Sequence, residues 1–265
     1  MRITRSMLAA ALVAACWCCQ PAWATSFSGD QSDLWYNPSE SGWGMQLVQR
    51  GSVIFATLFV YDQSGKPSWY SATLSPTATA YTWSGDLLLT NGPWFGAVPF
   101  NPATVTYRKV GTISWDGRNI STGTVSYSVD GIGVTKSVVR QLLQYDDYSG
   151  TYMGAMRYST TGCSDPTQNT HGDLFVTFQI IQNGQSITMA ISGSGLGVFT
   201  VSGTLAQAGQ FGTLSGTYTS TAGEVGNAGV ELMNVQVRSF TGLFFLNSTN
   251  KACQTTLILV GMWQS

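Results

Sequence analysis

The sequence predicts an all-β protein built from two tandem antiparallel meander domains, each a small barrel or sandwich of about eight strands. Two observations lead to this prediction. Strand-like segments of about ten residues recur between glycine-containing turns, and no segment has the apolar spacing of an amphipathic helix. The same plan occurs in both halves of the 265-residue chain, so two domains of similar size are expected.

The first domain is expected at residues 25–146. Its clearest turn signals are Asn91-Gly92, Asp116-Gly117 and Asp130-Gly131, because these dipeptides supply the positive φ that tight hairpins need. The expected strands are a short one at 34–36, followed by 43–50, 52–62, 67–77, 81–90, 104–116, 120–130 and 134–144.

The second domain is expected at residues 147–265. Asn183-Gly184 is a strong hairpin signal, and apolar residues at 174, 176, 178 and 180 alternate with more exposed positions. The expected strands are 150–158, 172–182, 185–193, 197–206, 211–220, 229–238, 241–247 and 253–263. A single membrane barrel made from all the strands is the rival architecture.

Residues 1–24 have the pattern of a signal peptide. Arg2 and Arg5 precede an apolar stretch at residues 7–19, and Ala22-Trp23-Ala24 offers a cleavage site before Thr25. The alternative is a lipoprotein signal, because Val13-Ala14-Ala15-Cys16 resembles a lipobox that would leave a lipid anchor on Cys16. Both interpretations predict export.

The charge content is unusually low. Only 9% of the residues are charged, against about 25% in ordinary soluble domains. Without Arg2 and Arg5 the chain has 10 basic and 13 acidic residues, a net charge of −3. No run of basic residues is present, so nucleic acid is not an expected partner. A surface with so little charge is typical of matrix, cell-surface or outer-membrane proteins.

Cys163 and Cys253 are the only cysteines outside the signal region, and we expect them to form one disulfide. In an eight-stranded meander barrel the first and last strands are antiparallel neighbours. Cys163 follows the first strand of the second domain and Cys253 begins its last strand, so both should lie at the same end. A metal site is the weaker reading, because two thiols and one distant histidine make no ligand set.

We assign no catalytic residue, metal or cofactor. His171 is the only histidine and lies in a polar loop, so no Ser-His-Asp or Cys-His arrangement can be built around it. A hydrolase with paired carboxylates is the enzymatic alternative, and Glu40 with Asp62 is the pair we would nominate.

The candidate ligand-binding residues are tryptophans and one carboxylate in the first domain. Six of the seven tryptophans that follow residue 24 lie there, and indoles near loop ends can stack on sugars or aromatic ligands. Glu40 stands alone among aromatic rings in the loop that follows Asn37-Pro38. The predicted site is Glu40, Trp35, Trp43, Trp69 and Trp83. The alternative is that the indoles fill the core and Glu40 anchors a turn.

The first half resembles a family of exported proteobacterial proteins. The shared motifs are LWYNPSESGWG, FATLFVYD and GKPSWY, with TNGPWF and VRQLL further on, and the resemblance extends to Gln141. Tyr36 stands where a second tryptophan is usual in that family. The resemblance implies export from a Gram-negative cell to the periplasm, outer surface or medium, and implies no activity. The second half is similar only by analogy to avidin-like and lipocalin-like barrels, an analogy that carries no function.

Together these observations predict an exported, non-catalytic binding or surface-scaffold protein. Its ligand would be a glycan or another small polar-aromatic molecule, held by the first domain. The alternatives are the secreted hydrolase and a protein that self-assembles into matrix fibres, which low charge and β-rich segments favour.

Overall fold

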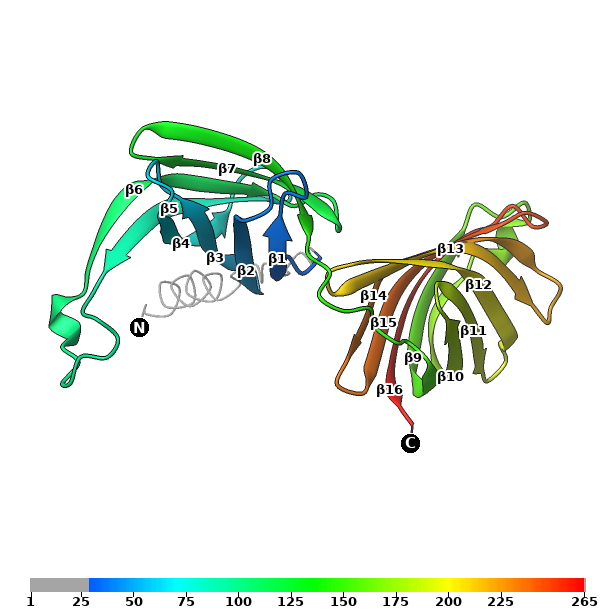
Figure 1. The fold of residues 1–265 in the computed structure, drawn as a ribbon. Coiled ribbons are helices and arrows are strands. Elements are labelled where there is room, and N and C mark those ends of the chain that lie inside the picture. Colours follow the sequence, from blue (N-terminus) through cyan, green and yellow to red (C-terminus); the bar gives the residue numbers. More distant parts are fainter. Residues whose placement is uncertain (1–28, 265) are drawn as a thin grey trace, which may run out of the picture.

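The structure is a computed structural model that describes residues 29–264, and nearly all of its regular structure is β-strand (Figure 1). The strands form two closed antiparallel barrels in tandem, each of eight strands in meander order. The first barrel contains β1 (Asp33–Tyr36), β2 (Gly44–Arg50), β3 (Val53–Tyr61), β4 (Pro67–Pro76), β5 (Thr82–Asn91), β6 (Thr106–Asp116), β7 (Thr122–Val129) and β8 (Ile132–Arg140). The second contains β9 (Gly150–Thr161), β10 (His171–Asn183), β11 (Ser186–Gly193), β12 (Gly197–Ala208), β13 (Phe211–Ser220), β14 (Val225–Gln236), β15 (Ser239–Ser248) and β16 (Gln254–Trp263).

This architecture confirms the predicted fold class and decides between the forms left open. Both domains are barrels rather than sandwiches, because β1 pairs with β8 and β9 pairs with β16. The rival of one large membrane barrel is wrong, since the described strands close into two separate rings. The signal peptide at residues 1–24, and with it the choice between cleavage and a lipid anchor at Cys16, lies outside the described residues.

Most hairpins form where the turn chemistry predicts them. Val129 pairs with Ile132, so Asp130 and Gly131 make a two-residue turn in which both residues have positive φ. Two short 3₁₀ helices interrupt the loops, η1 (Pro102–Thr104) and η2 (Pro166–Gln168). Each begins with a proline behind a capping Asn101 or Asp165 side chain, which accepts a backbone N–H from the first turn.

Each barrel encloses its own hydrophobic core, because inward and outward side chains alternate along the strands. Tryptophans dominate the first core, where Trp35 packs edge-on against Trp115 with ring centroids 4.6 Å apart. The second core contains tyrosine and phenylalanine rings, of which Tyr152 and Phe178 are stacked at 5.1 Å. No buried side-chain nitrogen or oxygen among the described residues lacks a hydrogen-bond partner.

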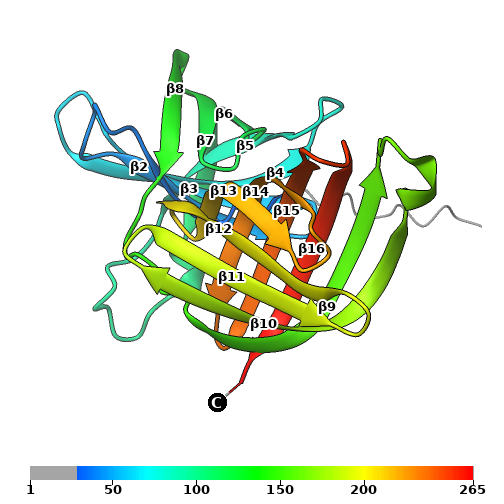
Figure 2. The ribbon, with the colours of Figure 1, turned by 90° about the vertical axis from the view of Figure 1, so that its right-hand side faces the viewer.

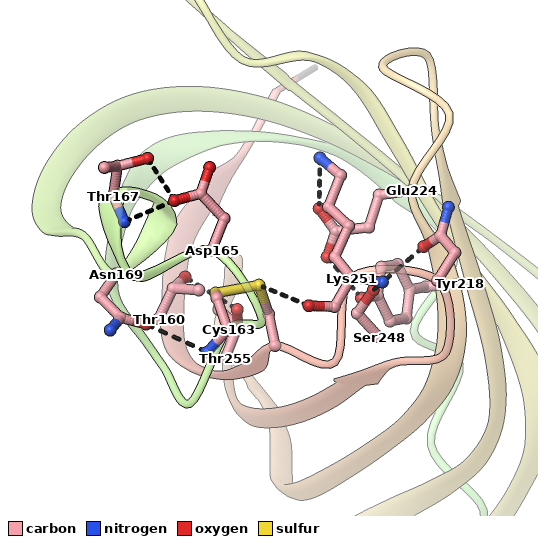
Figure 3. Close-up of a disulfide and its surroundings, with 12 residues drawn as sticks. Thr160, Cys163, Asp165, Thr167, Asn169, Tyr218, Glu224, Ser248, Lys251 and Thr255 are labelled. Atoms are coloured by element: carbon pink, nitrogen blue, oxygen red, sulfur yellow. Dashed lines mark hydrogen bonds and ion pairs between the residues drawn. A yellow bond between two sulfur atoms is a disulfide. The ribbon is translucent and has the colours of Figure 1, made fainter.

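The seam of the second barrel lies between β9 and β16, which Figure 2 shows side by side. Gly154 allows the two strands to approach, since a Cβ there would clash with the carbonyl oxygen of Val260. Just beyond the seam, Cys163 and Cys253 form a disulfide (Figure 3). The predicted pairing, and its position at the closing seam, are therefore confirmed.

Arg140 joins the two barrels. Its fully buried guanidinium donates to Asp33 Oδ2 at 3.1 Å and to the backbone carbonyls of Asp30 and Ser32. It also lies over the ring of Trp35 in the first barrel and over Phe211 in the second, at 4.4 and 4.9 Å from the ring centroids. From the second barrel, the backbone N–H of Gln210 donates to the same Asp33 oxygen. One charged side chain thus contacts residues of both barrels.

Candidate functional site

Glu40 is tied to its own loop and to a neighbouring strand. The loop between β1 and β2 places its carboxylate where Oε2 accepts the indole N–H of Trp43 at 3.0 Å. Oε1 accepts from the ammonium of Lys136 on β8 at 2.7 Å. The hydrogen bonds from Lys136 and Trp43 hold the pKa of Glu40 below its ordinary value. These contacts make Glu40 an anchor of the loop.

The structure places Trp35 and Trp83 inside the first barrel. Their side chains are 1% and 4% exposed. Both indole N–H groups are occupied, Trp35 by the carbonyl of Gln31 and Trp83 by that of Ser52. Neither ring can stack on a ligand unless the barrel opens. Their positions fit the alternative, in which tryptophans fill the core.

Trp43 and Trp69 lie nearer the surface, but they have different neighbours. Trp43 is half-buried against the core and engaged with Glu40. Trp69 on β4 is 49% exposed and lines a shallow outer pocket with Phe59, Tyr61 and Gly42. Neither Glu40 nor Trp43 lines that pocket. The five predicted residues therefore do not converge on one site.

The two carboxylates of the hydrolase alternative each serve a local turn. Asp62 accepts the backbone N–H groups of Ser64 and Lys66 and the Ser64 hydroxyl, which lowers its pKa. The pKa of Glu40 is lowered as well. A carboxyl pair that cleaves glycosides needs one member with a raised pKa to act as the acid. This pair lacks that asymmetry.

His171 lies at the start of β10 as an exposed residue opposite Ser159. Within residues 29–264 no three His, Cys, Asp or Glu side chains lie close enough to hold a metal ion. In the same range, no helix is long and apolar enough to cross a membrane.

The strongest candidate site is a cavity in the mouth of the second barrel, which the sequence did not single out. It has a volume of about 370 Å³ and opens between the strand ends beside the disulfide. Mouths of β-barrels are common places for small-molecule sites. Its apolar walls come from six residues on five strands and one turn: Met156, Leu174, Leu196, Phe199, Leu246 and Leu257.

Aromatic rings close the barrel below this cavity. Tyr152 stacks on Phe178, and Phe240 packs against both rings. Tyr148, which precedes β9, fills the far end and donates its hydroxyl to the carbonyl of Met233 at 3.3 Å. The cavity lies toward the end of the barrel that carries the disulfide, and these rings do not line it.

A polar group lies at the rim of the cavity (Figure 3). The hydroxyl of Tyr218 on β13 donates to Glu224 Oε1 at 2.7 Å, and Lys251 lies 3.5 Å from Glu224 Oε2. Burial, followed by the bond to Glu224, raises the pKa of the Tyr218 hydroxyl, so it stays protonated and keeps donating. Glu224 is thus an oriented acceptor beside a chamber whose lining combines apolar side chains with Ser and Thr hydroxyls.

One sequence signal could have pointed to this rim. Glu224 is the first acidic residue after Asp173, and it follows a glycine turn in a chain that has very few charges. The apolar lining carries no such signal, because its residues have the ordinary alternation of a barrel core.

Comparison with protein-family models finds no match, and neither does comparison with curated proteins. Among solved structures, one similar chain is a candidate outer membrane protein of Bacteroides fragilis. The alignment covers 88% of this chain and 95% of that protein's chain, with 15% sequence identity and a TM-score of 0.35. The isotype 1 transferrin-binding protein B of serogroup B Neisseria meningitidis matches 88% of this chain and 69% of its own, with 8% identity and a TM-score of 0.34. Likenesses this distant assign no ligand or partner to this chain.

Proposed function

We propose that this is an exported binding protein of the cell envelope whose second barrel holds a small amphiphile in its mouth cavity. The observation that carries the proposal is the combination found at that mouth. An apolar chamber of about 370 Å³ ends at a rim where Glu224 is held by Tyr218. Chambers with apolar walls and a few fixed polar groups are the usual form of ligand sites.

The rim chemistry indicates the kind of ligand. The carboxylate of Glu224 accepts hydrogen bonds, so a ligand end that donates one, such as an amine or a hydroxyl, fits beside it. An anionic end would be repelled by the nearby charge of Glu224. Lys251 offsets that charge only in part, because its ammonium lies 3.5 Å from the Glu224 carboxylate. A neutral or cationic amphiphile therefore fits better than an anionic one.

Export is supported by the disulfide, because such bonds persist in oxidising compartments. The structure favours this proposal over the alternatives from the sequence. A glycan site built on indoles could not use Trp35 or Trp83, because both are buried in the core. Fibre growth needs free sheet edges, and the second barrel offers none at its seam, where β9 and β16 pair along their length.

Binding can be tested with N-phenyl-1-naphthylamine, a neutral apolar probe with one N–H donor whose fluorescence rises in apolar surroundings. Ala222 lines the mouth and is exposed, so Ala222→Trp should obstruct the cavity without disturbing the core. We expect the Kd to rise at least about tenfold, the equivalent of 1.4 kcal/mol. Ala78→Trp, on an exposed turn of the first barrel, is the matched control and should leave the Kd unchanged.

The rim is tested with a second probe, 8-anilino-1-naphthalenesulfonate, which adds a sulfonate to the same skeleton. The neutral probe should bind more tightly, and Glu224→Gln should reduce this preference because it removes the opposing charge. Equal effects of Ala222→Trp and Ala78→Trp, or an absence of binding by the neutral probe, would contradict the proposal.

A further inference from the structure

The loop between β5 and β6, residues 92–105, carries large apolar side chains that contact little of the protein. Trp94 is 68% exposed, Phe95 90% and Val98 95%, and Phe100 is also exposed. Figure 1 shows the loop and η1 extending well beyond the other strand ends of the first barrel. Aromatic residues at an extended tip are expensive to leave in water.

The charge pattern around the loop shows what kind of surface it fits. No Asp, Glu, Lys or Arg occurs from residue 87 to residue 107. At its base, Lys109 pairs with Asp86 at 2.7 Å, and Arg108 holds Asp130 through two hydrogen bonds. These four charges sum to zero. The loop offers no electrostatic attraction to a charged partner, so an uncharged, apolar partner matches it.

Part of the loop backbone needs no hydrogen-bond partner outside the loop. Three of its residues are prolines, which have no N–H to satisfy. The N–H groups of Ala97, Thr104 and Val105 donate to carbonyls within the loop, and that of Ala103 donates to the Asn101 side chain. Backbone that reaches the hydrocarbon must satisfy its polar groups internally. Among the described residues, the N–H groups of Trp94, Phe95 and Val98 have no partner, so these residues belong at the hydrated headgroup level rather than in the bilayer core. Tryptophan and phenylalanine are the residues that partition into the membrane interface.

We propose that this loop docks the protein onto the surface of a phospholipid bilayer, with Trp94, Phe95 and Val98 inserted at the level of the headgroups. Because the loop and its flanking charges carry no net charge, a zwitterionic bilayer is sufficient and salt does not weaken the attachment. The proposal concerns the first barrel alone, so it stands whether or not the second barrel binds an amphiphile.

Quenching of tryptophan fluorescence by vesicles of brominated phosphatidylcholine tests this in the purified exported protein. Quenching reports the depth of an indole, so tryptophan variants show which indole is inserted. We expect strong quenching that persists in high salt. Trp94→Phe should remove most of it, whereas Trp69→Phe should not, although Trp69 is also exposed.

Phe95→Ser with Val98→Ser should weaken partitioning at least about tenfold, because two large apolar side chains no longer leave water. Phe55→Ser with Phe59→Ser, an exposed pair on the outer face of β3, is the matched control and should have no effect. Three results would overturn the proposal. They are equal losses in both double variants, quenching only with anionic lipid, and a lipid-free dimer that Phe95→Ser with Val98→Ser dissociates.

Discussion

Glu40 keeps its charge because donors occupy both of its oxygens. Lys136 and Trp43 bind the ionised carboxylate, and this lowers its pKa in the folded protein. A lowered folded pKa means that the contribution to stability is present above the unfolded pKa. It is lost as the pH falls through the folded pKa. The Glu40 side chain lies at the surface, 40% exposed, so solvent screening keeps this contribution small.

Removing Lys136 should release the pKa of Glu40. In Lys136→Met, the Glu40 pKa measured by NMR titration should rise toward its ordinary value, because the largest cause of the lowering is gone. Asp165 is the internal control, since its pKa is lowered by Thr167 within its own turn and should not move. An unchanged Glu40 pKa in this variant would show that the ion pair is absent in solution.

The sequence does not predict whether each tryptophan points into the barrel or out of it. Trp83 is followed by Ser-Gly and Trp69 is preceded by Pro-Ser, so both have polar, turn-like neighbours. Yet Trp83 points into the barrel and Trp69 points out. A shift of one residue in a strand exchanges the two faces, and strand bounds estimated from sequence are no more precise than that.

At the scale of the elements, the strands themselves were predictable. Period-two alternation and Gly-containing turns are local signals, and they located eight strands in each half. The exceptions have local causes. The strand expected at 104–116 begins at Thr106 because Pro102–Thr104 forms η1. The strand expected at 229–238 begins at Val225 and contains an irregularity between Glu231 and Asn234, where the register shifts.

The disulfide is the covalent element of the second barrel. It closes a loop with a sequence separation of 90, and the chain-entropy model gives about 4 to 5 kcal/mol for a loop of that length. The variant with Cys163→Ala and Cys253→Ala should lose stability of this order in chemical denaturation. Peptide mapping under non-reducing conditions that finds both thiols free in the natural chain would contradict the pairing.

At the scale of the whole molecule, Arg140 makes the two barrels depend on one another. Its guanidinium donates to carbonyls and a carboxylate of the first barrel and also lies over the ring of Phe211 in the second. Removal of one partner from a buried pair leaves the other charge uncompensated, which costs about 3 to 5 kcal/mol.

Arg140→Met should therefore destabilise the protein by about 3 to 5 kcal/mol in denaturant unfolding, and should separate the unfolding transitions of the two barrels. Arg157→Met is the matched control. Arg157 pairs with Asp173 on the exposed face, where such a pair contributes about 0 to 1 kcal/mol. A loss for Arg140→Met as small as that for Arg157→Met would show that Arg140 acts as an ordinary surface charge.

The candidate site could not be predicted because it exists only when the barrel closes. Tyr158 and Leu257 become neighbours at the seam, and Tyr218 reaches Glu224 across a hairpin. Each of these residues looks like core or turn in the sequence. The tryptophans of the first half are the conspicuous feature of the sequence, but most of their rings pack in the barrel core.

The most direct test of the account uses the methionine methyl groups in NMR. With N-phenyl-1-naphthylamine bound, we predict intermolecular NOEs between the probe and the methyl group of Met156, which lines the cavity of the second barrel. Met45, buried in the core of the first barrel, should show none. NOEs that reach Met45, or a bound probe that shows no NOE to Met156, would contradict the assignment of the site to the second barrel.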